Sequence, residues 1–297
     1  MAIDRKHAVA VMVVAVLAAY LFFSLAWISL PGPDADEVLF IAVWYRYSPI
    51  SFYVDHFRIF HSNIVTMVGS YNGALKGWLW SLFFAVNRSM YTVRIPAALL
   101  GGVILALFYC WVRRLYSGPT ALVALLLAAT DPVYIISSRI DSGPVVLQRL
   151  LLLVGILAGT SWLLDRARPA RAHSRLAASG LCLGLALWDK ATFAWCLLAL
   201  AATLLVLFPR EILRRLRPYP AAVFLLFFCL GSLPLTVFNV RAADSGTRGF
   251  IRWESFDTRT WTHKWANFRL TLDGRYLYRT MGGGLIDRGE VATVDDA

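Results

Sequence analysis

Residues 8–30 read AVAVMVVAVLAAYLFFSLAWISL, a run of 23 residues that carries no charged side chain and follows the basic pair Arg5 and Lys6. A helix that crosses the hydrocarbon core of a bilayer needs about 20 mostly apolar residues. The apolar region of a cleaved signal peptide is shorter, usually about 7–15 residues. The run therefore predicts an uncleaved membrane anchor, and the Pro-Gly-Pro sequence at 31–33 predicts a sharp end to its helix.

Six further apolar runs follow the first. Apolar residues make up 59% of the 297 positions and charged residues only 16%, whereas a soluble domain is about one half apolar and one quarter charged. Composition and block pattern together predict an all-α integral membrane protein, a polytopic bundle of about seven transmembrane helices. The six later spans are expected at 96–112, 119–137, 145–164, 176–188, 191–209 and 219–240.

The first loop, residues 31–95, is long, polar and aromatic. Within it, residues 74–86 read ALKGWLWSLFFAV, which is short for a span and rich in Trp and Phe. Such a segment is typical of an amphipathic helix that lies on the membrane surface. We therefore expect amphipathic helices in this loop, one of them at 74–86, rather than another span.

Basic residues are concentrated in short links between the apolar runs. Twelve of the 29 Lys and Arg residues lie in the head and in the links 113–118, 165–175 and 210–218. With seven spans these segments share one side, and basic short loops mark the cytoplasm. Topology thus explains the net charge of +11, and nucleic-acid binding is not expected, because no basic and aromatic surface is interleaved. The external segments are then 31–95, 138–144, 189–190 and the tail.

The tail, residues 241–297, differs from the transmembrane core formed by residues 1–240. It mixes acidic, basic and aromatic residues and has no apolar run that could close it. We expect it to begin an external segment and the chain to be the N-terminal portion of a longer protein.

The acidic cluster after the first span holds three carboxylates within four residues, Asp34, Asp36 and Glu37. Such carboxylates repel one another, which favours a retained proton or a bound cation. A carboxylate here suits a general base that takes a proton from an acceptor. One alternative is that Asp34 or Asp36 caps a helix that begins near Glu37. Another is that the Asp34/Asp36 pair holds a divalent cation through oxygen ligands.

Further polar residues fall on the same predicted side. Lys190, at the turn between the fifth and sixth spans, either snorkels to the interface or binds a lipid phosphate. Arg139 and Asp141 form either an ion pair or part of a site. No zinc or redox site is expected, since the four cysteines lie in apolar runs without paired spacing. The candidate substrate-binding residues are Asp34, Tyr71, Lys76, Arg139 and Lys190.

Four segments resemble motifs of the GT-C superfamily of glycosyltransferases that use polyprenyl-phosphate sugars, near the protein O-mannosyltransferases and the aminoarabinose transferases of lipid A. DADEVLFIAVWYR (34–46) is similar to the family's acidic pair after the first span. The stretch 70–101 resembles its Gly-Ala-Leu-Lys segment with the following Arg-x-Pro. SSRIDSGP (137–144) looks like its second external acidic motif, and GLALWDKAT (184–192) like its Gly-Leu-Ala…Lys turn.

The resemblance implies a role for each matching residue. Asp36 would be the catalytic base with Glu37 beside it, Asp141 a second acidic site residue, and Lys190 and Arg139 the cations that hold the donor phosphate. It also implies an inverting transfer to a lipid, glycan or protein acceptor, at a site that faces the periplasm or exterior of the inner (plasma) membrane.

Two other functions are compatible with a multi-pass membrane chain. A transporter or flippase of a lipid-linked substrate predicts ionisable groups within the spans, whereas the span interiors here are nearly free of charge apart from Arg149. A non-catalytic membrane fragment is the second alternative. The sequence identifies neither the sugar nor the acceptor.

Overall fold

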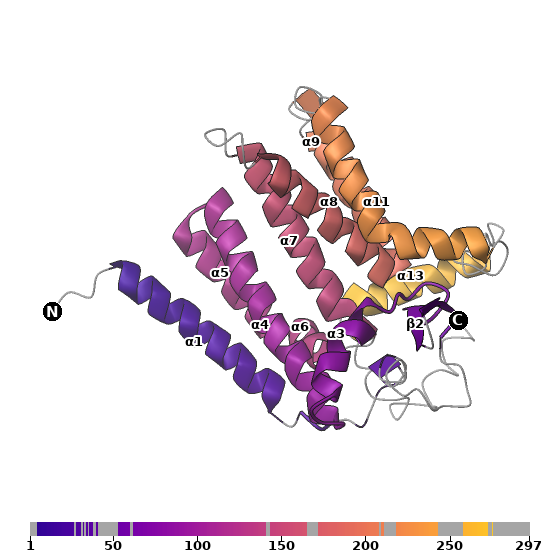
Figure 1. The fold of residues 1–297 in the computed structure, drawn as a ribbon. Helices are drawn as coiled ribbons and strands as arrows, with labels where there is room; N and C mark the ends of the chain where they lie inside the picture. The colour runs from indigo at the N-terminus through magenta and orange to yellow at the C-terminus, as the bar shows by residue number, and fades with distance from the viewer. Residues whose placement is uncertain are drawn as a thin grey trace. The chain divides into compact units, whose positions relative to one another are not determined.

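A computed structural model describes residues 5–26, 28–30, 32, 34, 36–37, 40, 53–59, 62–140, 143–164, 172–207, 209–210, 218–242, 258–272 and 275. The chain divides into two compact units, Met1–Phe250 and Ile251–Ala297. The second unit contributes helix α13 (Thr258–Leu272). The elements of the first unit (Figure 1) are α1 (Arg5–Leu25), β1 (Asp55–Ile59), β2 (Ser62–Met67), α3 (Leu75–Phe84), α4 (Met90–Leu115), α5 (Gly118–Thr130), α6 (Pro132–Arg139), α7 (Val145–Leu164), α8 (Ala172–Asp189), η2 (Ala191–Phe193), α9 (Ala194–Leu207) and α11 (Pro218–Arg241).

The structure confirms an all-α polytopic membrane protein, with fewer clear spans than the seven predicted. Among the described residues, four helices (α1, α4, α7 and α11) are long and apolar enough to cross a bilayer, or five if the bent pair α5–α6 is one span. The other two predicted spans are also helical. However, α8 carries the polar residues His173, Ser174 and Arg175 near its start, and η2–α9 is a shorter apolar helix.

The predicted single span at 119–137 is two helices that meet at an angle of 61°. The side chain of Asp131 accepts a hydrogen bond from the backbone N–H of Val133 at 2.9 Å, and Pro132 occupies the first turn of α6. A capping carboxylate followed by proline is a strong helix start. The Asp131-Pro132 pair therefore ends α5 and redirects the chain into α6.

Two of the apolar clusters in the first unit share α4. One joins α1, α4 and α5 through Tyr20, Leu105 and Leu125. The other joins α3, α4 and α7 around Trp80 and Val146. Helix α4 therefore lies at the centre of this half of the unit (Figure 1).

Helices α8 and α11 approach each other through glycines. A Cβ atom at Gly184 would collide with the carbonyl oxygen of Phe228, and one at Gly231 would lie 2.6 Å from the carbonyl oxygen of Leu181. Small residues that let backbones touch are the usual means by which helices associate in membranes, where the hydrophobic effect between helices is absent. The glycines let the two backbones approach closely, and large apolar side chains, such as Trp188 of α8 and Phe238 of α11, pack beside them.

Gly184→Ala is expected to destabilise the protein by about 1–3 kcal/mol, because an overpacked interface forces the two backbones apart. Gly102→Ala is the matched control: it also lies inside a helix, but its Cβ would make only ordinary contacts, 3.5 Å or more from the nearest atom. The control should be neutral or slightly stabilising, since alanine is the better helix former. Thermal unfolding of both variants in the same detergent measures the difference. Equal melting temperatures would contradict the close packing.

The sequence predicts amphipathic helices in the first loop. Its described residues hold α3 within the stretch 74–86, together with a β-hairpin, β1–β2, that was not predicted. The hairpin lies against the end of α8, where the indole Nε1 of Trp188 donates to the carbonyl oxygen of Thr66 at 3.0 Å. The adjoining turn pairs with the same end: Gly73 N–H donates to Asp189 O at 3.0 Å, and Ala191 N–H donates to Tyr71 O at 2.8 Å. These backbone bonds bring the first loop beside Lys190.

Candidate active site

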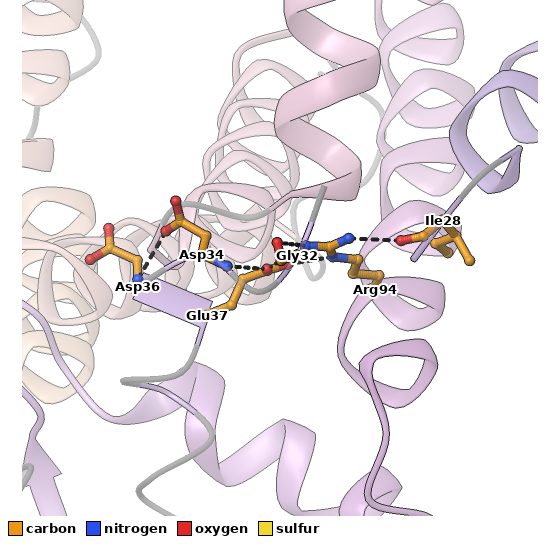
Figure 2. Close-up of polar contacts among 6 residues, drawn as sticks. All are labelled: Ile28, Gly32, Asp34, Asp36, Glu37 and Arg94. Carbon is orange, nitrogen blue, oxygen red and sulfur yellow. Dashed lines mark hydrogen bonds and ion pairs between the residues drawn. The ribbon is translucent and has the colours of Figure 1, made fainter. Parts of the chain in front are cut away.

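A buried ion pair between Arg94 and Glu37 links the acidic cluster to helix α4 (Figure 2). Both side chains are fully buried. The guanidinium binds both carboxylate oxygens, with Nε to Oε1 at 2.9 Å and Nη2 to Oε2 at 2.8 Å. Two parallel N–H to carboxylate bonds are the strongest common geometry for this pair. Glu37 is thus held in one position by a residue of α4.

Arg94 also fixes the backbone that leads to the acidic cluster. Its Nη1 donates to the carbonyl oxygen of Ile28 at 2.8 Å, and its Nη2 to that of Gly32 at 3.0 Å. Glu37 Oε2 in turn accepts the backbone N–H of Asp34 at 3.0 Å. One side chain of α4 therefore positions three points between residues 28 and 37 (Figure 2).

The two aspartates of the cluster have different surroundings. Asp34 Oδ1 accepts the backbone N–H of Asp36 at 2.9 Å, which is the capping contact expected as one alternative. The Asp36 carboxylate is half-buried and points away from the Arg94 guanidinium (Figure 2). Asp36 is therefore the carboxylate of the cluster that is best placed to act on a substrate.

Gly143 is the point at which the first loop, the link before α7 and the turn after α8 meet. A Cβ built on this glycine would lie 3.1 Å from Lys190 Nζ and 3.6 Å from Asp36 Oδ2. The Asp36 carboxylate and the Lys190 ammonium thus lie together against the Gly143 backbone. The prediction that these segments share one side agrees with this convergence. Gly143 also has φ of +90°, a conformation that residues with a side chain rarely adopt.

Lys76 also binds the backbone of Gly143. Its buried ammonium donates to the carbonyl oxygen of Gly143 at 3.1 Å and lies 5.0 Å from the ring centroid of Phe40 and 5.5 Å from that of Trp80. A desolvated cation between aromatic rings and a carbonyl is well stabilised. Lys76 therefore fixes the position of Gly143.

Gly143→Ala is expected to reduce activity more than stability. The positive φ costs an alanine about 1–2 kcal/mol, while the added methyl group displaces Lys190 or Asp36, and a small misplacement of reacting groups can cost about 100-fold in rate. The transfer rate and the melting temperature of the same preparation measure the two effects. Gly118→Ala is the control, since a Cβ there meets nothing within 4 Å. A fully active Gly143→Ala protein would contradict the proposed geometry.

The remaining predicted residues lie around this centre or outside the described part of the chain. Tyr71 is half-buried in an apolar cluster with Met67 and Trp188. Arg139 is half-buried, donates from Nη1 to the carbonyl oxygen of Ala26 at 3.0 Å, and interacts electrostatically with the Arg94–Glu37 pair. Asp141 lies outside the described residues, so its predicted contact with Arg139 stays a prediction.

Arg94 and Gly143 organise the site, and the sequence predicted a role for neither of them. The signal for Arg94 was a single arginine that precedes a long apolar run, since a charge at membrane depth is costly and usually has a purpose. Its partner Glu37 is 57 residues away, so the pairing could not be predicted from local spacing. Gly143 gave no comparable signal.

Within the described part of the chain, no group of three or more His, Cys, Asp or Glu side chains is arranged to hold a metal ion. Asp34 and Glu37 already accept hydrogen bonds from the protein. A cation bound by the Asp34/Asp36 pair stays a prediction. The arrangement of Asp36 beside Lys190 offers one proton acceptor and one cation at a single place.

A comparison with protein families supports a family assignment. The family described as dolichyl-phosphate-mannose-protein mannosyltransferase matches residues 73–234, more than half of the chain. The matched range contains Lys76, Arg94, Gly143 and Lys190, and Asp36 precedes it. No curated protein and no solved structure matches the chain.

Proposed function

Because the chain belongs to the dolichyl-phosphate-mannose-protein mannosyltransferase family, whose members are membrane glycosyltransferases of GT-C type, we propose that it transfers a sugar from a polyprenyl-phosphate donor to an external acceptor. The observation that carries the proposal is the placement of the Asp36 carboxylate and the Lys190 ammonium against Gly143. A proton acceptor and a cation side by side suit the transfer of a group whose leaving group is a phosphate.

The proposed reaction is a direct displacement. An acceptor oxygen or nitrogen attacks the anomeric carbon of the sugar, and the bond from that carbon to the phosphate oxygen breaks. The electron pair leaves with the polyprenyl phosphate, and Asp36 takes the proton of the acceptor. Since attack comes from the face opposite the leaving group, the anomeric configuration inverts. The chemistry needs one base and one or more cations.

The cations have separate roles in this proposal. Lys190 lies at Gly143 together with Asp36 and would stabilise the charge that develops on the phosphate, as a preorganised cation does in a site with little water. Lys76 is buried and would act by positioning Gly143 rather than by touching the substrate. Arg139, Asp34, Tyr71 and Asp141 are proposed to line the substrate site, and Glu37 to position Asp36 through Arg94.

The chain is a multi-pass membrane protein, and we place its site on the external side of the inner membrane. The support is the accumulation of basic residues in the head and in the links 113–118, 165–175 and 210–218, which favours the cytoplasm for the opposite ends of the helices. A lipid-linked sugar presented outside would then reach Asp36 and Lys190 from the membrane.

An apolar groove between α3 and α4 suits the isoprenoid chain of such a donor. The groove has a volume of about 660 Å³, and its lining includes Trp80, Phe83, Ile95 and Leu99. Trp80 connects it to the site, because the same ring lies 5.5 Å from Lys76 Nζ, which binds Gly143 O. We propose that the isoprenoid chain lies in this groove with its phosphate towards Lys190.

Leu99→Trp should fill part of the groove and raise the KM for the donor by about tenfold, which corresponds to a loss of about 1.4 kcal/mol of binding. The kcat should change little, because the groove binds the isoprenoid chain of the donor equally well in the ground state and in the transition state. Leu126→Trp on α5 is the matched control, since Leu126 is 48% exposed, Leu99 is 49% exposed, and Leu126 does not line the groove. Steady-state kinetics with varied donor compare the two. Equal KM values for the Leu99→Trp and Leu126→Trp proteins would show that the isoprenoid chain of the donor does not lie in this groove.

The proposed function is tested with a polyprenyl-phosphate donor that carries a radiolabelled sugar. Membranes that contain the protein should move the label from the donor to a lipid, glycan or protein fraction, whereas a nucleotide sugar should not serve directly as donor. The same donor in sealed vesicles distinguishes transfer from transport. Movement of the intact donor across the bilayer without transfer would overturn the proposal in favour of a flippase.

A further inference from the structure

Helix α13 carries its large apolar residues on one narrow stripe. Trp261, Trp265, Phe268 and Leu272 follow one another at intervals of four, three and four residues. At about 100° per residue, these positions fall within a stripe about 60° wide. The rings of Trp265 and Phe268 lie against each other, with centroids 5.4 Å apart. The four residues therefore form one apolar stripe along the helix, with two aromatic rings in contact.

The stripe faces outward. All four of its side chains are exposed, by between 50% for Phe268 and 72% for Leu272. Ala266 and Leu270, which project from the other side of the helix, are instead partly buried. An exposed aromatic surface of this kind usually marks a site of interaction. The large apolar residues of α13 are thus available to something other than the described part of this chain.

The charges of α13 are arranged around that stripe. Lys264 and Arg269 lie about 70° to either side of its centre, whereas Arg259 lies about 150° away. The helix contains no acidic residue. An apolar face with Trp and Phe, bordered by basic residues, is the pattern of a helix that lies in the headgroup region of a bilayer. The long basic side chains reach upward to the phosphates while the rings sink below them.

We propose that α13 lies flat on the bilayer with its aromatic stripe inserted at the interface, and that acidic phospholipids bind at the two borders of the stripe, beside Lys264 and Arg269. The occupant is a lipid surface because the chain is already anchored in one, and only 16 residues separate α13 from the end of the apolar helix α11. Trp is enriched at this depth because its ring is apolar and its N–H is polar. Attraction of each basic residue to acidic headgroups adds to the binding.

Spin labels on the full-length protein test the position of the helix. In a background with the four native cysteines replaced by alanine, Leu272→Cys puts a nitroxide on the stripe and leaves all three aromatic residues in place. Asn267→Cys puts one on the opposite side and is the matched control. In vesicles of phosphatidylcholine and phosphatidylglycerol, the label at 272 should be accessible to oxygen and shielded from a water-soluble nickel complex. The label at 267 should show the reverse.

Three results would overturn the proposal. Equal exposure of both labels to nickel would place the helix in water, and a label at 272 immobilised by protein would place the stripe in an intramolecular or partner contact. Spectral broadening between labels would indicate a second copy of the chain. These outcomes are independent of sugar transfer, which is measured on the same samples.

A charge variant tests the lipid preference separately. Phosphatidylglycerol is expected to increase the access of oxygen to the label at position 272. Arg269→Gln should lose much of that increase, whereas Arg259→Gln should keep it, because position 259 lies about 150° around the helix from the centre of the stripe. Equal responses of the two variants would show that the acidic lipid does not bind at the border of the stripe.

Discussion

Glu37→Gln should destabilise the protein by about 3–5 kcal/mol, because it leaves the Arg94 guanidinium buried without its counter-charge. Arg94 is fully buried and relies on Glu37 for two of its bonds. Arg94→Met should be comparably costly, since it leaves the Glu37 carboxylate buried instead. Unfolding in a detergent titration measures both, with Arg113→Gln, an exposed arginine at the other end of α4, as the control.

The double variant Glu37→Met/Arg94→Met distinguishes the cost of a stranded charge from a direct contribution of the pair. Apolar replacements of a whole buried pair are often neutral, so the double variant should recover much of the stability that either single variant loses. Activity should not recover with it, because the bonds from Arg94 to Ile28 O and Gly32 O are lost and Asp36 is no longer positioned. Recovery of both would show that the pair has no part in organising the site.

Asp36→Asn should reduce the transfer rate by about 100- to 10,000-fold, the usual contribution of a general base. Asparagine has nearly the same shape, and the bond from Asp36 N–H to Asp34 Oδ1 uses the backbone, so the local fold should persist. Asp131→Asn is the matched control: Asp131 is exposed, it caps α6, and asparagine caps a helix as well as aspartate does. The control should keep full activity.

The parts of the fold that follow from apolar runs could be predicted from the sequence. The runs at 8–30, 145–164 and 219–240 each correspond to one helix, and the stretch at 74–86 contains α3. Helix α1 ends at Leu25, however, before the predicted end of its span at residue 30. The break at Asp131 was visible as a capping residue before proline, but its consequence, a bend of 61° within one predicted span, was not. A local sequence pattern such as Asp-Pro predicts where a helix ends, but it does not predict the direction of the next helix.

The close approach of α8 and α11 could not be predicted, because it depends on which glycines face a partner. Gly180 and Gly184 have the same local sequence signal as any glycine in a helix, where they are merely unfavourable. Their role appears only when Phe224 and Phe228 of α11 lie opposite. The hairpin β1–β2 was missed for a similar reason, since its strands are stabilised by Trp188, far away in the sequence.

The candidate site, too, could be predicted only in part. Topology predicted that the acidic cluster and Lys190 lie on one side, and the structure brings Asp36 and Lys190 together at Gly143. The different surroundings of the three carboxylates could not be predicted, since they depend on Arg94, which binds Glu37 and leaves Asp36 pointing away. In the proposed mechanism, the long-range ion pair between Arg94 and Glu37 therefore decides which carboxylate is available as the base.

The most direct test of the account is single-turnover transfer by the Asp36→Asn protein, with donor binding measured on the same sample. The account predicts that the variant binds a polyprenyl-phosphate sugar as tightly as the wild-type protein and melts at the same temperature, yet transfers the sugar at least 100-fold more slowly. A folded Asp36→Asn protein that binds the donor and transfers its sugar at the wild-type rate would contradict the central claim that Asp36 is the base.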